Sequence, residues 1–142
     1  MSILILCDHE NGQLSPVTLN AVSAASQIGG EMHLLVAGDQ TGNVAKAAAS
    51  IAGIAKVLVA DDKSLENGLA ENLAPLMQSL SRSYSHMMAA ATTTGKNVMP
   101  RLAALLDVMQ ISDIIKIDDA NTFQRPIYAG NALSTVSSNE AI

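Results

Sequence analysis

The chain has 142 residues, a formal net charge of −5 and 49% hydrophobic residues, and we expect one α/β domain over residues 1–142. It has no cluster of Lys and Arg, which argues against nucleic-acid binding because neutralising phosphates needs grouped cations. The N-terminal apolar run, residues 3–7, is too short for a signal peptide or a membrane span. Cys7 is the only cysteine, so no internal disulfide can form, and a reducing compartment fits. We therefore expect a soluble intracellular protein without membrane insertion.

Apolar runs and amphipathic stretches alternate along most of the chain. Short apolar runs of this kind are typical of strands covered on both faces. Strands are predicted at 3–7, 32–37, 55–60, 85–91 and 111–117. Helices are predicted at 16–28, 41–51, 65–83 and 97–108, with Pro75 kinking or splitting the third and Pro100 in the first turn of the fourth. Five strands joined by helices predict a three-layer α/β fold, with a mostly parallel sheet between two helical layers.

The pattern changes after residue 117. Two short strands, 123–128 and 132–137, flank the residues Ala129-Gly130-Asn131. Because Gly and Asn tolerate positive φ, this stretch predicts a β-hairpin over about 122–138. The chain is therefore expected to be a parallel α/β unit that ends in an antiparallel hairpin.

The stretch ATTTGKNVMPR, residues 91–101, resembles part of a phosphate-binding loop. A Walker loop needs glycine where Ala90 stands and Ser or Thr where Asn97 stands, so that reading fails. The stretch still follows a predicted strand and opens a helix, where free N–H groups favour an anion. The alternative is that Thr94 or a neighbouring threonine caps the helix. The weak nucleotide-loop candidates are Thr92, Thr93, Thr94, Gly95 and Lys96.

Other polar groups give no convincing catalytic or metal site. Residues 8–10 read Asp-His-Glu, but adjacent residues rarely converge on one ion, and a solvated loop is the simpler interpretation. His33 and His86 fall in predicted strands and read as hydrogen-bonded structural residues. Two acidic pairs, Asp61-Asp62 and Asp118-Asp119, each follow a predicted strand. Paired acids at such a place can act as acid–base groups, or they can be solvated turn residues that begin a loop. We expect no catalytic residue and no metal ligand, and hence no enzyme with its own turnover site.

Three ordered motifs make the second half of the chain specific. Residues 94–104 read TGKNVMPRLAA, residues 111–114 read ISDI, and residues 122–132 read TFQRPIYAGNA. Together they resemble the N-terminal domain of the electron transfer flavoprotein alpha subunit. The opening residues 3–5 and the loop at 9–12 fit the same family, so the resemblance covers essentially the whole chain.

The resemblance implies a fold and a role. The fold is that of the adenine-nucleotide-hydrolase-like, Rossmann-like α/β domains. The family carries electrons from flavin-dependent dehydrogenases, such as acyl-CoA dehydrogenases, to a membrane quinone oxidoreductase. FAD is held mainly by a C-terminal domain with help from the beta subunit, and the beta subunit holds AMP. Because this chain stops after the hairpin, we expect the FAD-binding domain to be absent and this chain alone to bind no FAD.

The same resemblance implies a scaffolding role in a heterodimer with the beta subunit. Arg101, Arg125 and Tyr128 stand in the family motifs and are the interface candidates, with local packing roles as the alternative. The rival function is a stand-alone adenine-nucleotide-binding module of the universal-stress type, using residues 92–96. A bacterial cytoplasm is the expected location, or the mitochondrial matrix if a transit peptide has been removed.

Overall fold

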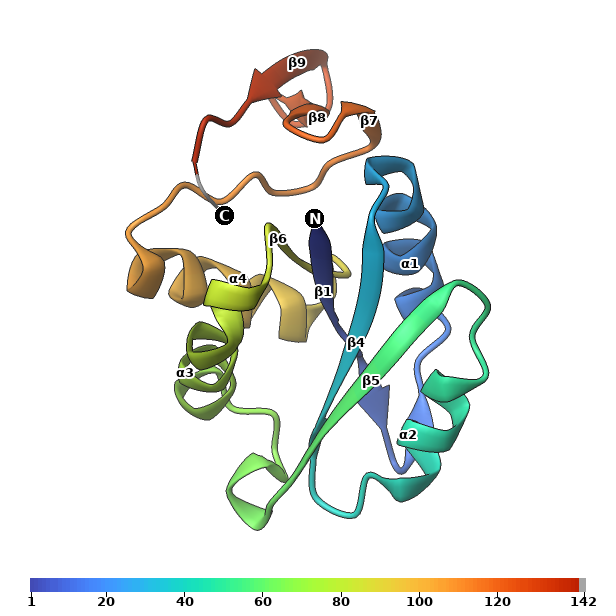
Figure 1. Cartoon of the computed structure of the whole chain (residues 1–142). Coiled ribbons are helices and arrows are strands. Elements are labelled where there is room, and N and C mark those ends of the chain that lie inside the picture. Colours follow the sequence, from blue (N-terminus) through green and yellow to red (C-terminus); the bar gives the residue numbers. More distant parts are fainter. Residues whose placement is uncertain (141–142) are drawn as a thin grey trace.

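A four-stranded parallel sheet forms the centre of the computed structural model, which describes residues 1–140 (Figure 1). Its strands lie in the order β5-β4-β1-β6. They are β1 (Ser2–Leu6), β4 (Glu31–Gly38), β5 (Ile54–Asp61) and β6 (His86–Ala89). All three pairings are parallel, as buried runs separated by helical segments predict. The predicted α/β class is confirmed.

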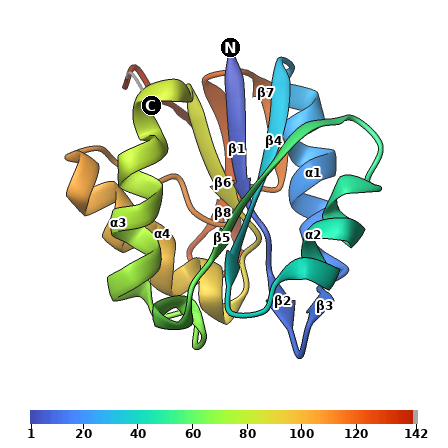
Figure 2. The same cartoon turned by 60° about the horizontal axis from the view of Figure 1, so that its bottom comes forward.

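Helices cover both faces of this sheet, which gives three layers (Figures 1 and 2). One face carries α1 (Val17–Ile28) and α2 (Gly42–Ala49), and the other carries α3 (Ala70–Leu80) and α4 (Thr93–Leu106). Two 3-10 turns, η1 (Lys63–Leu65) and η2 (Ser81–Ser83), flank α3. Within residues 1–140, no helix is long and apolar enough to cross a membrane.

Alternation along β1 divides the core into two clusters. Ile3 and Ile5 pack toward α1 and α2, whereas Leu4 and Leu6 pack toward α3 and α4. All four are buried, and each such side chain contributes about 1.5–3 kcal/mol of transfer free energy. The nearly continuous apolar run in the sequence is therefore explained by burial on both faces of the sheet.

The two proline-containing helices differ from their predicted bounds. The predicted helix 65–83 is the shorter α3 between two 3-10 turns, and it continues through Pro75 rather than splitting there. The predicted helix 97–108 begins one turn earlier, at Thr93, because Thr92 caps it. Pro100 therefore lies inside α4 and not in its first turn, so that part of the prediction is wrong.

The fifth parallel strand predicted at 111–117 is also wrong. Residues 107–115 contain no strand, and β7 (Lys116–Asp119) belongs to a separate antiparallel sheet of order β7-β8-β9. Only Ala120 and Asn121 connect β7 to the next strand, and a parallel crossover needs about a dozen residues. The short connection fixes the β7–β8 pairing as antiparallel, and Ile115, just before β7, is 62% exposed.

The predicted C-terminal hairpin is confirmed. It consists of β8 (Thr122–Ile127) and β9 (Ala132–Ser137), paired antiparallel from Thr122 with Ser137 to Ile127 with Ala132. Its loop is four residues long, and positive φ values occur at Tyr128, Ala129 and Gly130. Figure 1 shows this small sheet, drawn in orange to red, above the N-terminal end of the parallel sheet. The His86 ring ties the two sheets together, with Nε2 lying 2.6 Å from the Ala120 carbonyl oxygen.

Candidate functional site at the strand ends

The carboxyl ends of β1 and β6 are the place where this fold would receive a ligand. The order β5-β4-β1-β6 reverses direction between β1 and β6, and ligands of open parallel sheets bind at such a switch point. The cavity there has a volume of only about 10 Å³. That is about the space of one water molecule, whereas sites for small molecules measure roughly 300–1,000 Å³. The switch point is closed by the chain's own atoms.

The first turn of α4 closes the β6 side of this point. A Cβ atom added at Gly95 would overlap the Ala90 carbonyl oxygen, so the first turn of α4 rests directly on the end of β6. Thr92 caps α4, because its Oγ1 accepts a hydrogen bond from the Gly95 N–H at 3.2 Å. Lys96 points to a carboxylate of its own chain, with Nζ 3.6 Å from Asp113 Oδ1. The predicted threonine cap is confirmed, and the glycine is explained by close packing.

The loop after β1 closes the β1 and β4 side. It contains a short antiparallel hairpin of β2 (His9–Glu10) and β3 (Gln13–Leu14), visible beside α2 in Figure 2. The His9 Nε2 atom lies 2.7 Å from the Ala37 carbonyl oxygen, which fixes the ring over the end of β4. No group of three potential metal ligands occurs in residues 1–140. The sequence pattern missed this hairpin because each of its strands has only two residues.

Cys7 stands at the same strand end but offers no reactive thiol. It is buried in the cluster of β1, β4 and α1. Burial raises the pKa of this thiol to about 12, so it is protonated at neutral pH. The nucleophilic form is therefore scarce, as the apolar sequence context predicts.

Asp61 and Asp62, the first acidic pair, build turns. Asp61 accepts hydrogen bonds from the Thr41 N–H at 2.9 Å, the Thr41 hydroxyl at 3.0 Å and the Gln40 N–H at 2.9 Å. The bonds from Thr41 hold the pKa of Asp61 below its usual value. Asp62 accepts from the N–H and hydroxyl of Ser64, which lowers its pKa in the same way. Both groups are ionised acceptors, which supports the turn interpretation over acid–base chemistry.

The second acidic pair has the same structural role. Asp118 lies 2.7 Å from Lys116 Nζ and accepts a hydrogen bond from the Gln124 amide at 2.9 Å. The hydrogen bond from Lys116 is the main cause that lowers the pKa of Asp118. Asp119 accepts from the Asn121 N–H at 2.8 Å and shapes the turn between β7 and β8. These contacts likewise support the turn interpretation.

A larger cavity lies elsewhere, along the outer side of β6. Its volume is about 460 Å³, and its walls come from α1, β6, α4, residues 108–114 and the small antiparallel sheet. The lining is mostly apolar, as with Ala24, Met88, Leu102, Ile111 and Phe123. Sequence reasoning missed this cavity because it assigned residues 111–117 to a fifth strand of the parallel sheet. Among residues 1–140, β6 pairs on one side only, with β1.

The three interface candidates lie on two different elements. Arg101 is on α4, where its Nη1 atom lies 3.2 Å from Glu71 Oε1 on α3. Arg125 is half-buried on β8, and its Nε atom has no hydrogen-bond partner among the described residues. Tyr128 is 78% exposed in the β8–β9 loop. The structure thus places two of the three together in the C-terminal sheet and gives Arg101 a local partner.

Fold and site together define a doubly wound α/β domain whose ligand crevice is filled by its own loops. The family model for the electron transfer flavoprotein domain matches residues 3–142 of this sequence. The chain therefore belongs to the electron transfer flavoprotein family, and the resemblance inferred from the motifs is confirmed.

Its relatives are alpha subunits. The chain is 53% identical to the electron transfer flavoprotein subunit alpha of Pseudomonas aeruginosa, over 100% of this chain and 46% of that protein. It is 50% identical to the Paracoccus denitrificans subunit alpha, over 99% of this chain and 46% of that protein. It is 44% identical to the mitochondrial subunit alpha of Dictyostelium discoideum, over 96% of this chain and 41% of that protein. The chain spans about half the length of the curated relatives it matches.

Proposed function

We propose that residues 1–142 are a single domain, the N-terminal domain of an electron transfer flavoprotein alpha subunit. Its role is to scaffold a heterodimer with a beta subunit, and electrons pass through FAD in that complex. The observation that carries the proposal is the family match over residues 3–142, at up to 53% identity to an alpha subunit. The closed strand ends agree with it, because a scaffold needs no cofactor crevice of its own.

The residues at the strand ends do not fit FAD. A dinucleotide needs a crevice and free donors for its pyrophosphate, whereas this crevice holds about 10 Å³ and Gly95 is pressed against Ala90. The aromatic side chains are also committed elsewhere. Phe123 is buried at the wall of the apolar cavity beside β6 and Tyr84 is bonded to His33, so among residues 1–140 Tyr128 is the one exposed aromatic side chain. We place FAD outside this domain, and this chain supplies no turnover site.

Visible absorption tests the position of the flavin. The purified 142-residue chain is mixed with excess FAD, passed through gel filtration and scanned. The proposal expects a colourless protein, since no residue cluster at the strand ends can retain the flavin. A retained band of about one flavin per chain would place a FAD site inside this domain and overturn that part of the proposal.

The proposed interface includes Arg101, Arg125 and Tyr128. The exposed phenol of Tyr128 and the half-buried Arg125 are of the residue types enriched at interface centres. Co-purification with an electron transfer flavoprotein beta subunit tests them, using Tyr128→Ala against Leu69→Ala, an exposed apolar residue that precedes α3. We expect Tyr128→Ala to weaken capture and Leu69→Ala to leave it unchanged. Equal capture by both variants would remove Tyr128 from the interface.

The rival function is adenine-nucleotide binding by residues 92–96. Its test requires a variant other than Gly95→Asp. Gly95→Asp would collide with Ala90 and report folding rather than binding. Lys96→Ala removes an exposed ammonium group and leaves the turn intact. Calorimetric titration with AMP should give no heat of binding to the unchanged chain. Saturable binding that Lys96→Ala abolishes would favour the rival.

Flavin-dependent dehydrogenases and a quinone oxidoreductase are the proposed partners of the full complex. Relatives from bacteria and relatives named as mitochondrial both match this chain. A bacterial cytoplasm is the location we propose, with the mitochondrial matrix as its alternative.

A further inference from the structure

The outer edge of β6 borders a cavity instead of another strand. Among the described residues, β6 pairs with β1 on one side and with no strand on the other. Every residue of β6 is half-buried. The cavity of about 460 Å³ runs along the whole of this edge, because all residues from Ser85 to Ala91 line it. A mostly apolar space therefore stands where a strand inside a sheet has its neighbour.

This cavity lies in the layer of the parallel sheet. The helix α1 lines it with Ala21 and Ala24, and α4 lines it with Met99 and Ala103. These two helices pack on opposite faces of the sheet. Residues 108–114, which include part of the stretch predicted to be a fifth strand, form a wall of the cavity instead. The space beside β6 and between the two helical layers thus has the surroundings of a fifth strand.

The backbone of β6 directs hydrogen-bonding groups into the cavity. In a strand, the N–H and C=O groups of successive residues point to alternate sides. The Cys7 N–H donates to a carbonyl oxygen of β4 at 2.9 Å, so the groups of Leu4 and Leu6 point to β6. In a parallel ladder each of these two residues bonds to the neighbours of its register partner, and the partners are Met87 and Ala89. The N–H and C=O groups of Met87 and Ala89 therefore point away from β1, toward the cavity.

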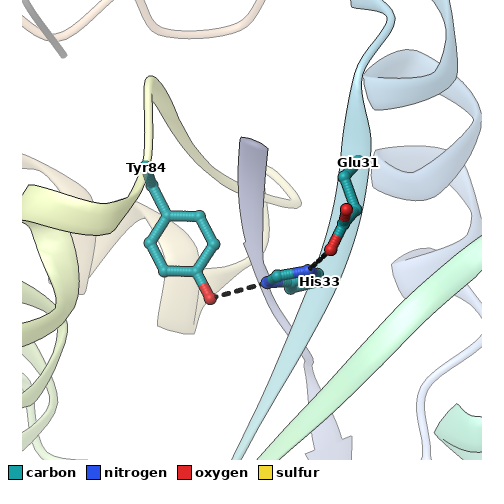
Figure 3. Close-up of polar contacts among 3 residues, drawn as sticks. All are labelled: Glu31, His33 and Tyr84. Carbon is teal, nitrogen blue, oxygen red and sulfur yellow. Dashed lines mark hydrogen bonds and ion pairs between the residues drawn. The ribbon is translucent and has the colours of Figure 1, made fainter. Parts of the chain in front are cut away.

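The chain that enters β6 is fixed from the side of β4. The Tyr84 hydroxyl lies 2.8 Å from His33 Nδ1, and Glu31 Oε1 lies 2.6 Å from Nε2 of the same ring (Figure 3). The Tyr84 and His33 rings also meet edge to face, with their centroids 5.4 Å apart. Both side chains are buried. The open edge thus belongs to a strand already held in position, which lowers the cost of adding a neighbour.

The C-terminal part of the described chain lies at the first residue of β6. The Ala120 carbonyl oxygen is 2.6 Å from Nε2 of His86, where β6 begins. The Ser138 N–H donates to the carbonyl oxygen of the adjacent Asn121 at 2.9 Å. Ser138 and Glu140 both line the cavity. The chain therefore leaves β9 beside the start of β6, which is the place from which a parallel neighbour would run along the open edge.

We propose that the open edge of β6 binds a fifth parallel strand from the same polypeptide, formed by the residues that follow residue 142 in a full-length alpha subunit. This chain covers 46% of the length of the Pseudomonas aeruginosa and Paracoccus denitrificans subunits, so such residues exist in the relatives. The inference rests on the proposed place of this chain as the N-terminal domain of a longer subunit.

Two physical arguments select this occupant. The N–H and C=O groups of Met87 and Ala89 need hydrogen-bond partners, and a neighbouring backbone supplies donors and acceptors at the strand repeat, whereas an apolar small molecule supplies none. A segment tethered beside His86 also binds at a high effective concentration, which a separate chain lacks. A tethered strand therefore satisfies the edge better than either alternative.

An extended chain tests the proposal. The 142-residue chain is fused to the next ~12 residues of the Pseudomonas aeruginosa subunit, enough at about 3.3 Å per residue to run past β6. Amide hydrogen exchange of Met87 and Ala89 is then measured by NMR. We expect their protection factors to rise by about fivefold or more over the 142-residue chain, the effect of roughly one added hydrogen bond at each amide. Unchanged exchange in the extended chain would overturn the proposal.

A scrambled extension of the same composition is the control for sequence. It should leave the exchange of Met87 and Ala89 as it is in the unextended chain. Equal protection by the scrambled extension would show that any added residues cover this edge, and it would refute a specific fifth strand.

A matched pair of variants on α4 tests whether the added strand occupies the cavity. Ala103 lines the cavity, whereas the next residue, Ala104, is exposed and does not. In the extended chain, Ala103→Phe should abolish most of the added protection, because the larger ring fills the space of the strand. Ala104→Phe should preserve it. Full protection in Ala103→Phe would place the added segment outside the cavity and contradict the proposal.

Sedimentation separates this strand from a second copy of the chain. We expect the extended chain to be monomeric while Met87 and Ala89 are protected. Protection that rises with protein concentration together with a dimer would assign the edge to a second copy and overturn the proposal. The scaffold function has its own readout in capture by the beta subunit. Capture without protection of these amides would refute the fifth strand alone, and protection without capture would refute the scaffold alone.

Discussion

The parallel sheet and the small C-terminal sheet differ in how they are buried. In β1 and β4 nearly every side chain after the first is buried, whereas Phe123 is the one fully buried residue of β7 to β9. The parallel unit holds itself together between two helical layers. The antiparallel sheet contacts it through the buried Phe123, through the half-buried Ile117 and Ala120, and through the His86–Ala120 hydrogen bond. The difference shows that one chain can join a core enclosed by two helical layers to a small sheet with few core contacts and much open surface.

The largest effect is expected from removing Phe123, the buried residue that attaches the C-terminal sheet to the core. Phe123→Ala empties a core position and should lower the free energy of unfolding by about 3–5 kcal/mol. Hydrogen exchange should show the loss concentrated in β7 to β9. Leu133→Ala, at a 62% exposed site of the same sheet, is the control and should change stability by less than about 0.5 kcal/mol. Similar losses for the two variants would contradict the role of Phe123 as the main anchor.

The next largest effect concerns the closed strand ends. Gly95→Ala forces a methyl group against the Ala90 carbonyl and should lower the free energy of unfolding by about 3 kcal/mol, measured by urea denaturation. Gly42→Ala is the matched control at the start of α2, where a Cβ atom meets nothing within 4 Å. It should be neutral or stabilise by about 0.5 kcal/mol. A tolerated Gly95→Ala would mean that α4 does not seal β6.

A smaller effect follows from Asp61 at the end of β5. The pKa of Asp61 is lowered in the folded state, so its stabilisation is present above the usual carboxyl pKa and is lost as pH falls through the folded value. Asp61→Asn should therefore reduce the acid dependence of stability below about pH 4. Thermal unfolding between pH 2 and 6 measures it. Asp39→Asn is the control. If both variants reduce the pH dependence of stability equally, the role of Asp61 is refuted.

The smallest expected effect is at Arg101. Its ion pair with Glu71 is about half exposed, and such pairs contribute about 1 kcal/mol or less. A double-mutant cycle of Arg101→Ala and Glu71→Ala measures the coupling. If Arg101 binds the beta subunit, Arg101→Ala should weaken that complex while leaving stability nearly unchanged. A coupling above about 2 kcal/mol would make Arg101 a structural residue instead.

The order of helices and strands could be predicted as far as α4, because the periodicity of apolar residues reflects which side chains are buried. Ile3 to Leu6 read as a covered strand, and they are one. The stretch 111–117 was assigned to a strand on its four isoleucines, yet β7 pairs antiparallel with β8 and Ile115 lies in solvent. Local hydropathy cannot tell which sheet a run will join. The two-residue connection to β8 determines only that β7 and β8 pair antiparallel.

The candidate site also has features that the sequence predicted and features that only the tertiary structure decided. The sequence alone determined the α/β class, the hairpin at Gly130, the absence of a Walker loop and the family, because these depend on local patterns and ordered motifs. Tertiary structure alone decided that Gly95 seals β6, that His9 covers β4, and that Glu31, His33 and Tyr84 meet. His33 and Tyr84 are 51 residues apart, and only the parallel order β4-β1-β6 brings them together. Contacts of that separation are set by packing, which no local sequence pattern encodes.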